Sequence, residues 1–217
     1  MVKEILKNIW VINGNGYDNN CYIVVKDNTC VVIDSSSYNV AIKDFVKTKK
    51  LKLLGIVLTH AHFDHYGLAN KLAEEMDVKI YVHKDEKVTF KLLKMADECG
   101  FPTTEPDWNN FVFFNSKELK FEDIEFKVML TPGHTEGGIV LIYNIVFFTG
   151  DTLFADSIGR TDFEGGDMKQ IMKSVYQIAK AMKDNDYLLC GHGRLYPQFK
   201  EVKQINPYVQ HVLSKYE

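Results

Sequence analysis

The chain has 217 residues, of which 46% are hydrophobic, so it can bury a sizeable core in one large or two small domains. Its formal net charge is −3 at pH 7, and this near balance disfavours a nucleic-acid-binding surface, which is usually basic. Neither a cleavable leader segment nor an apolar run of membrane-spanning length is recognisable, so we expect a cytoplasmic protein without membrane partners.

The first third of the chain predicts a strand meander, a helix and one buried strand. Residues 9–12, 21–25 and 30–34 are strand-like, and turn-forming residues separate them. The apolar residues of the segment 38–49 fall on one helical stripe, which predicts an amphipathic helix. The apolar run at residues 53–59 then predicts a buried strand that ends in a cluster of polar side chains.

The rest of the chain continues with helical and strand patterns. Asp167 is placed to cap a helix, with Gln170 as its reciprocal partner. The order of the elements predicts two sheets covered by helices in one layered α/β domain that spans residues 1–217. We predict helices over residues 67–76, 85–98 and 167–182, strands over 80–83, 118–121, 124–131 and 187–190, a hairpin of 139–142 and 145–149 that turns at Tyr143-Asn144, and one or two short helices over 198–216.

The most informative segment is residues 59–65, Thr-His-Ala-His-Phe-Asp-His, directly after the buried strand. It places three imidazoles and one carboxylate within six residues, and these groups are nitrogen and oxygen ligands of zinc and related ions. His60 and His62 are two residues apart, so they project to the same side of an extended chain. Asp64 and His65 fall where the strand gives way to a turn, and there they can face a second point.

Three later segments repeat one pattern, in which an apolar strand ends in a small-residue turn and then a metal-binding side chain. The side chains are His134, Asp151 and His192, and Gly precedes each of them. Gly permits the close backbone approach that a crowded metal site requires. With the first cluster these make seven candidate ligands, which suit two ions about 3.5–4 Å apart better than one tetrahedral ion. We expect Asp151 to bridge the two ions, because it stands alone at its strand end and has two oxygens.

The ordered set of these residues resembles the metallo-β-lactamase fold superfamily, and it extends over most of the chain. The segments 131–135, 149–154 and 159–162 look like the glyoxalase II branch of that superfamily. The resemblance implies a four-layer αββα sandwich with two divalent metals at one edge, zinc first, and iron or manganese as alternatives. Carried over by position, it assigns one metal to His60, His62 and His134 and the second to Asp64, His65 and His192, with Asp151 shared.

The resemblance further implies a metal-dependent hydrolase similar to the short hydroxyacylglutathione hydrolases of bacteria and archaea. Two cations that share a water molecule lower its pKa from about 15.7 toward about 7, and the hydroxide would cleave a thioester such as an S-acylglutathione, or a related ester. Asp64 and Asp151 are the candidate catalytic carboxylates, and Asp64 can also orient the hydroxide. The chain ends 25 residues after His192, so contacts to glutathione from an added C-terminal region are left open, as are the substrate-binding residues.

Two other functions stay open at this point. A mononuclear iron dioxygenase acting on glutathione persulfide, from a sister branch, would use two histidines and one carboxylate and leave coordination positions for oxygen. A metal-bound interaction module without catalysis is the second, although it would not need a full ligand set. An RNA-processing nuclease and a secreted β-lactamase are disfavoured by the missing basic excess and leader segment. The expected partner is a small-molecule substrate, and assembly into a homo-oligomer is left open.

Several further residues have two interpretations each. Asp34, at a strand end, either hydrogen-bonds a ligand imidazole or forms a structural turn. Arg160 either holds the loop behind the metal site, by pairing with Asp162 or another carboxylate, or forms a weak surface pair. Aromatic residues at Tyr17 and in the loop 100–114 either line the pocket or pack in the core. We expect buried or partly buried free thiols at Cys21, Cys30, Cys99 and Cys190.

Overall fold

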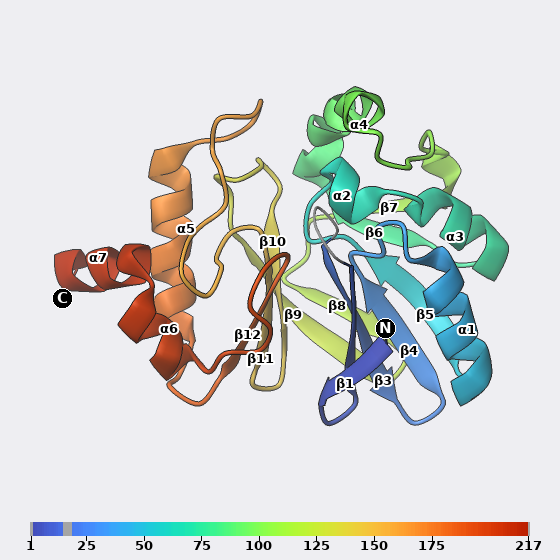
Figure 1. Ribbon diagram of the computed structural model, residues 1–217, viewed down its shortest axis with the longest axis horizontal. Helices are drawn as coiled ribbons and strands as arrows, with labels where there is room; N and C mark the ends of the chain where they lie inside the picture. Colours follow the sequence, from blue (N-terminus) through green and yellow to red (C-terminus); the bar gives the residue numbers. More distant parts are fainter. Residues whose placement is uncertain (1, 15–18, 217) are drawn as a thin grey trace.

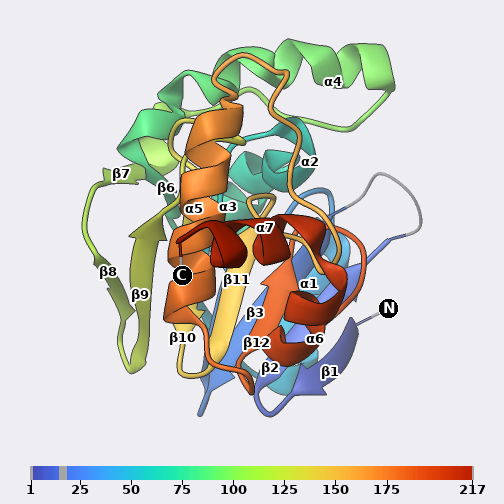
Figure 2. The same cartoon turned by 90° about the vertical axis from the view of Figure 1, so that its left-hand side faces the viewer.

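A computed structural model describes residues 2–14 and 19–216, which form two β-sheets stacked face to face with helices on both outer sides (Figures 1 and 2). Within these residues, strands β1 to β4 of the larger sheet form an antiparallel meander, and β4 to β7 run parallel. The larger sheet contains, in spatial order, β1 (Val2–Leu6), β2 (Ile9–Asn13), β3 (Asn20–Lys26), β4 (Thr29–Ile33), β5 (Lys52–Val57), β6 (Ile80–His83) and β7 (Phe111–Phe114). The smaller sheet contains, in spatial order, β12 (Tyr187–Cys190), β11 (Val146–Gly150), β10 (Ile139–Tyr143), β9 (Ile124–Leu130) and β8 (Glu118–Phe121).

Helices cover the outer face of each sheet (Figure 1), which confirms the predicted αββα sandwich. The larger sheet is covered by α1 (Asn39–Lys49) and α3 (Ala69–Met76), and the smaller sheet by α5 (Met168–Ala181), α6 (Phe199–Ile205) and α7 (Pro207–Tyr216). The remaining helical segments are α2 (Phe63–Tyr66), α4 (Lys94–Cys99) and the 3₁₀ turns η1 (Lys84–Lys87), η2 (Thr89–Leu93) and η3 (Trp108–Asn110). Among the helices of the described residues, none combines the length and the apolar character that a membrane span requires.

Strand β3 shows why the central strands have continuous apolar sequences. Cys21 and Ile23 point to the helix side of the larger sheet, where they pack in one cluster with α1 and α3. Tyr22 and Val24 point to the opposite side and pack in a second cluster with residues of the smaller sheet. Side chains alternate along a strand, so a strand between two layers needs apolar residues on both faces. A third cluster fills the space between the smaller sheet and α5 to α7, which completes the four layers.

Several elements differ from the sequence prediction. The predicted helix over 67–76 corresponds to α3, which begins two residues later, and a separate short helix, α2, precedes it; Gly67, with a φ of +43°, lies between the two. The segment predicted as a helix over 85–98 forms η1, η2 and only a short α4. The edge strands β1 and β7 have no counterpart in the prediction, and β7 occupies part of the expected loop 100–114. These segments are short, so their periodicity gives a weak signal.

The hairpin of β10 and β11 is confirmed, but its turn lies one residue later than predicted. Tyr143 pairs with Val146, so the two turn residues are Asn144 and Ile145. Asn144 adopts a φ of +56°, a conformation that Asn tolerates better than most residues.

Helix α5 is capped by Asp167, as the sequence predicts. The Asp167 carboxylate accepts hydrogen bonds from the backbone N–H groups of Lys169 at 2.7 Å and Gln170 at 2.9 Å. The reciprocal contact differs from the prediction, because the Gln170 side chain donates to the Asp167 carboxylate at 3.3 Å. The Asp167 N–H instead donates to the carbonyl oxygen of Gly133 at 2.8 Å, and this bond ties the helix start to the loop after β9.

Replacing Asp167 with Ala is expected to lower the melting temperature by about 2–4 °C, because first-turn N–H groups lose their acceptor. Hydrogen bonds from Gln170 and Lys169 hold the pKa of Asp167 below its ordinary value. The stabilisation that these hydrogen bonds give the folded protein is therefore complete above about pH 4, and it is lost as the pH falls through the lowered pKa of Asp167. Thermal denaturation near pH 7 and near pH 3 tests this, with the exposed Lys169→Ala as control. An equal temperature difference at both pH values would contradict the prediction.

The cysteine prediction holds for three residues and is wrong for Cys99, which is exposed. Burial raises the pKa of Cys30 and Cys190 to about 12, and burial raises the pKa of Cys21 well above its ordinary value. Because the thiolate is the reactive form, we expect a disulfide reagent such as DTNB to titrate only Cys99 in the native protein near pH 8. All four thiols should react after denaturation. Rapid reaction of a native Cys99→Ser variant would disprove this.

Candidate metal centre

The predicted ligands come from chain segments that meet at one end of the sandwich. Strands β9 and β11 run in the same direction, because each is antiparallel to β10, and β12 is parallel to β11. The C-terminal ends of these three strands therefore lie at one edge of the smaller sheet, and the N–H of Ile139 donates to Thr59 O at 2.9 Å to join that sheet to the end of β5. His60, His62, Asp64 and His65 follow β5, and His134, Asp151 and His192 follow β9, β11 and β12.

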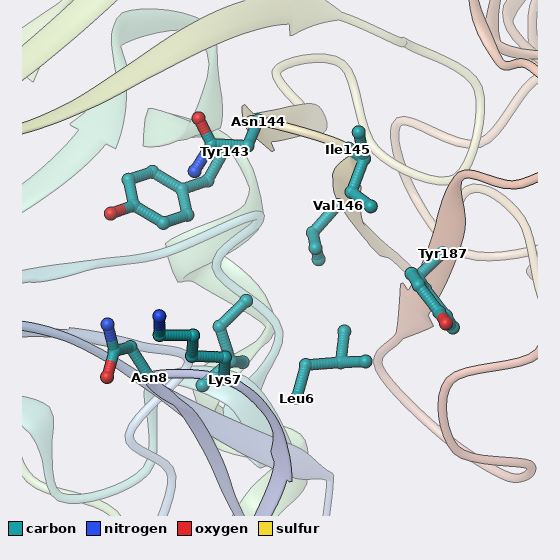
Figure 3. A pocket seen from close by; sticks show the side chains of 9 residues that line it. Leu6, Lys7, Asn8, Tyr143, Asn144, Ile145, Val146 and Tyr187 are labelled. Atoms are coloured by element: carbon teal, nitrogen blue, oxygen red, sulfur yellow. The ribbon is translucent and has the colours of Figure 1, made fainter.

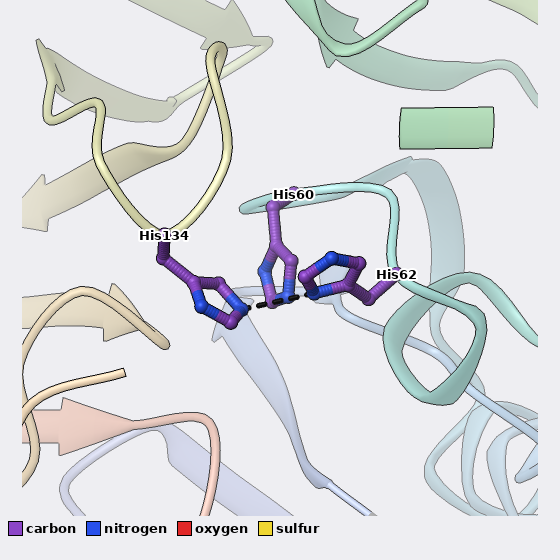
Figure 4. A group of neighbouring side chains, drawn as sticks. All are labelled: His60, His62 and His134. Carbon is purple, nitrogen blue, oxygen red and sulfur yellow. Dashed lines mark hydrogen bonds between the residues drawn. The ribbon is translucent and has the colours of Figure 1, made fainter. Parts of the chain in front are cut away.

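Three imidazoles form the first group, His60, His62 and His134 (Figure 4). Nδ1 of His62 and Nε2 of His134 are 2.9 Å apart, and one nitrogen from each ring lies within 4.8 Å of the others. Two nitrogens that bind one zinc ion at about 2.0–2.1 Å lie about 2.9–3.4 Å apart at bond angles of about 90–110°. The spacing therefore fits two nitrogens that share one ion.

A second group consists of Asp64, His65 and His192. Nε2 of His192 is 3.0 Å from Oδ2 of Asp64 and 3.3 Å from Nε2 of His65. The His65 side chain is fully buried, whereas the side chain of His192 is 29% exposed, so this group opens toward solvent on one side. Two imidazoles and a carboxylate make a mixed nitrogen and oxygen shell that suits zinc or iron.

The carboxylate of Asp151 lies between the two groups. Its Oδ1 is 3.2 Å from Nε2 of His65. Its Oδ2 is 3.4 Å from Nε2 of His192 and 3.6 Å from Nε2 of His134. One carboxylate thus reaches imidazoles of both groups, and all seven predicted site residues lie together in one cluster.

The hydrogen bonds of two rings leave lone pairs that point into the first group. Nδ1 of His134 donates to the carbonyl oxygen of Arg160 at 2.8 Å, so its Nε2 carries the lone pair. Nδ1 of His60 is 3.2 Å from the hydroxyl of Thr59, which donates to Asp34 at 2.7 Å. Nε2 of His60 is buried and has no hydrogen-bond partner in the described part of the chain. A buried acceptor without a donor costs free energy, and a bound cation removes that cost, so these residues fit a metal.

The three rings of the first group are neutral at pH 7. Burial lowers the pKa of His60 and of His134 below the ordinary value. Burial, together with the neighbouring His134, lowers the pKa of His62 to about 3. The neutral imidazole is the form that binds metal ions, so no proton has to leave this group before an ion binds.

The charged forms of His65 and Asp151 favour each other instead. Burial disfavours the charged form of His65, but Asp151, Asp34 and Asp64 outweigh burial and raise the pKa of this ring. Burial would raise the pKa of Asp151, but the neighbouring His65 outweighs burial and lowers it. The positive charge of protonated His65 therefore offsets the repulsion between the carboxylates around it. A cation that binds to His65 must replace that proton.

Glycines flank Asp151 where the backbone comes close, which confirms the expectation from the sequence. A Cβ atom on Gly150 would lie 2.4 Å from Oγ1 of Thr59, and φ of Gly150 is +48°. A Cβ atom on Gly191 would lie 2.0 Å from Oδ1 of Asp151 and 2.6 Å from Cε1 of His65. The ends of β11 and β12 therefore approach the cluster more closely than any residue with a side chain allows.

Asp34 fulfils both roles that the sequence leaves open. It has a φ of +54° directly after β4, which is a turn conformation, and its side chain is buried. Its carboxylate accepts the N–H and the hydroxyl of Thr59, each at 2.7 Å, and lies 2.9 Å from Nδ1 of His65. Asp34 therefore orients the His65 ring directly and the His60 ring through Thr59.

Glu86 is a buried carboxylate at this site that no motif in the sequence indicates. It lies in η1 and accepts hydrogen bonds from the N–H of Ala61, the hydroxyl of Thr135 and the N–H of Gly137. Burial raises the pKa of Glu86. These three donors lie 25, 49 and 51 residues away in the sequence, so no local pattern could indicate them, and Thr89 adds a local hydrogen bond.

The side chain of Arg160 forms a surface pair. Its Nε and Nη2 each donate to the Asp162 carboxylate at 2.7 Å, and the two side chains are 55% and 66% exposed. Such exposed pairs contribute little to stability. Arg160 meets the metal centre through its backbone, because its carbonyl oxygen accepts the hydrogen bond from His134.

The structure shows packing contacts for aromatic residues of the segment 100–114. Phe111 is buried and packs against Trp108, with ring centroids 5.3 Å apart, so it belongs to the core. The ring of Phe101 lies 5.5 Å from that of Phe63, so it packs against the first residue of α2. Tyr17 lies outside the described residues.

A separate cavity of about 390 Å³ lies at the opposite end of the sandwich (Figure 3). It is lined by the β1–β2 turn with Lys7, by the β10–β11 turn with Tyr143 and Ile145, and by Tyr187 at the start of β12. Because His192 follows the other end of β12, this cavity is not part of the ligand cluster.

Comparison with known proteins indicates one family. The family model of the metallo-beta-lactamase superfamily matches residues 14–192. The hydroxyacylglutathione hydrolase GloC of Haemophilus influenzae is 31% identical over 211 residues, which cover 93% of this chain and 98% of the relative. Among solved structures, the BLEG-1 B3 metallo-beta-lactamase aligns with a TM-score of 0.82 and 28% identity, over 93% of this chain and 99% of the other. The protein TTHA1623 in a di-iron-bound form aligns with a TM-score of 0.82 and 26% identity, over 91% and 98%.

The matched region contains the entire ligand cluster, from His60 to His192. Proteins of this superfamily bind metal ions, and the His and Asp groups at the sandwich edge agree with that property. The similarity to GloC spans nearly the whole of both chains. The chain therefore belongs to the metallo-beta-lactamase superfamily, within which it is similar to metal-dependent hydrolases.

Proposed function

We propose that this protein is a thioester hydrolase of the glyoxalase II type that works with two divalent cations. The observation that carries the proposal is the Asp151 carboxylate, which lies 3.2 Å from His65 and 3.6 Å from His134 and so reaches both groups. A single tetrahedral ion needs only three or four ligands, and the cluster offers seven. One cation would be held by His60, His62 and His134, the other by Asp64, His65 and His192, and both by Asp151.

When bound, the two cations lower the pKa of a shared water molecule to about 7 and polarise the carbonyl group that is attacked. The chain supplies orientation and exclusion of bulk water. The Asp64 side chain is 18% exposed, so it can accept a hydrogen bond from the attacking water and orient it toward the substrate. Asp34 and Thr59 hold the rings of His60 and His65 in place, so little reorganisation is needed during the reaction.

The similarity to GloC supports an S-acylglutathione or a related thioester as the substrate. That relative is a hydroxyacylglutathione hydrolase, and this chain covers 98% of its length. A thiolate leaving group is a soft anion, and zinc accepts soft sulfur ligands as well as nitrogen and oxygen. We therefore favour zinc as the metal, and we keep iron as the alternative because TTHA1623 binds two iron ions.

Metal quantification paired with a hydrolysis assay tests the proposal. We expect two equivalents of metal per chain and hydrolysis of S-D-lactoylglutathione that is lost on chelation and restored by added metal. The β-lactam nitrocefin serves as the comparison substrate, on which we expect little activity. An active protein that holds one metal per chain would contradict the dinuclear site, and hydrolysis of nitrocefin alone would contradict the thioester substrate.

A persulfide dioxygenase is a second candidate, which one observation favours. His60, His65 and Asp151 form a group of two histidines and one carboxylate, the ligand composition of non-haem iron oxygenases. Oxygen consumption with glutathione persulfide, in a protein that contains one iron and leaves thioesters intact, would establish this function. A third candidate, a metal-bound interaction module, would keep its biological role in an Asp151→Ala variant.

A further inference from the structure

Glu86 joins the two loops that carry the three-histidine group. Its Oε2 accepts the N–H of Ala61 at 2.7 Å, and Ala61 lies between the two histidines of the loop after β5. Its Oε1 accepts the hydroxyl of Thr135 at 2.6 Å and the N–H of Gly137 at 2.9 Å, and both residues follow the third histidine in the loop after β9. The two loops come from different sheets, so this one carboxylate spans the junction between the sheets.

The contacts of Glu86 require a carboxylate. Backbone N–H groups can only donate, and one of them lies on each oxygen, from Ala61 and from Gly137. Both oxygens must therefore accept, which an ionised carboxylate does and a side-chain amide cannot. The fit is also tight, because a Cβ atom on Gly137 would lie 2.6 Å from the backbone nitrogen of Glu86.

The second group is held by other contacts in the described residues. Asp34 lies 2.9 Å from the ring of His65. The backbone before His192 is held by the N–H of Gly191, which donates to the carbonyl oxygen of Gly150 at 2.8 Å. Three hydrogen bonds of Glu86 thus go to the loops of the first group, beside one from Thr89 in η2, and different residues support the second group.

We propose that Glu86 is a positioning residue that sets the geometry of the three-histidine metal position and not that of the second position. This inference rests on the proposed function, because it takes His60, His62 and His134 as ligands of one cation. The 2.9 Å spacing between His62 Nδ1 and His134 Nε2 depends on how the two loops are joined, and the Glu86 side chain joins them directly.

Titration of metal-free protein with Co²⁺, followed by visible absorption, tests this role without any substrate. Wild-type protein should bind two ions, and Glu86→Gln should weaken one of them by about 10–100-fold and change its spectrum. The affected position is identified with His134→Ala, which removes a ligand of the three-histidine group. Glu86→Asp keeps the charge on a shorter side chain and should recover part of the affinity.

Asp186→Asn is the matched control, because Asp186 is also a buried carboxylate that accepts a backbone N–H, from Lys183 at 2.7 Å, but lies in a loop before β12. It should bind both ions like wild type. Equal weakening of both ions in Glu86→Gln, or wild-type binding by that variant, would overturn the inference. If Glu86→Gln does not fold, Thr135→Val removes only one contact and should weaken the same ion less strongly, and wild-type binding by Thr135→Val would again overturn it. A wild-type protein that binds no Co²⁺ would instead refute the metal centre itself.

Discussion

Replacing Asp151 with Ala is expected to reduce thioester hydrolysis by more than about 100-fold. This loss is larger than the loss expected for a residue that only hydrogen-bonds a metal ligand. Asp151 reaches imidazoles of both groups, at 3.2 Å from His65 and 3.6 Å from His134, so its removal affects both metal positions at once. Metal content should fall from two equivalents per chain to one or fewer, as measured by elemental analysis. His134→Ala should also lose hydrolysis, but it should keep the ion held by the second group.

The fold should survive Asp151→Ala, because the three hydrophobic clusters do not include this residue. Circular dichroism is the check, and Asp186→Ala is the control for removal of a buried carboxylate, since the two residues are 9% and 7% exposed. We expect Asp186→Ala to lose some stability and to keep its metal and activity. Full hydrolysis by both His134→Ala and Asp151→Ala would rule out the assigned metal centre.

Replacing Gly191 with Ala is expected to weaken metal binding by more than about 100-fold through steric conflict alone. The added methyl group would lie 2.0 Å from Oδ1 of Asp151. The backbone cannot easily move away, because the Gly191 N–H donates to Gly150 O at 2.8 Å and the Gly191 carbonyl oxygen accepts the N–H of Asn20 at 2.6 Å. The carboxylate must therefore leave its place between the two groups, and overpacking of this kind costs about 1–3 kcal/mol of unfolding free energy.

Gly193→Ala provides a closely matched control two residues further along the chain. A Cβ atom on Gly193 meets nothing within 4 Å, and the only cost is its left-handed φ of +79°. This variant should lose about 1–2 kcal/mol of stability from backbone strain and bind metal like wild type. Metal titration combined with urea denaturation separates the two effects. Equal metal affinity in the two variants would show that the methyl group does not displace Asp151.

The positions of the ligands follow from local sequence signals. Each of the four chain segments combines an apolar strand with a metal-binding side chain at its end, and Gly precedes His134, Asp151 and His192. A buried strand presents its next residues at the sheet edge, so a histidine at that place can be recognised without knowledge of the partners. The same reasoning predicts the layered fold, because β3, β4 and β5 carry apolar residues for both faces. The departures concern short segments such as β1 and β7.

Only the tertiary structure reveals the side chains that hold the ligands in place. Glu86 lies in a segment whose apolar periodicity predicts a helix over 85–98, yet the chain there forms short 3₁₀ turns. Three of its donors are 25, 49 and 51 residues away, and the dual role of Asp34 depends on Thr59 and His65 in the same way.

The amino-acid sequence by itself determined the fold class and the set of metal-binding side chains, because burial periodicity and strand-end chemistry are local properties of the chain. The tertiary structure decided which carboxylates orient those side chains and how closely the two groups meet at Asp151. The physical reason is that a buried carboxylate must be matched by donors, and packing of the two sheets chooses those donors from distant segments.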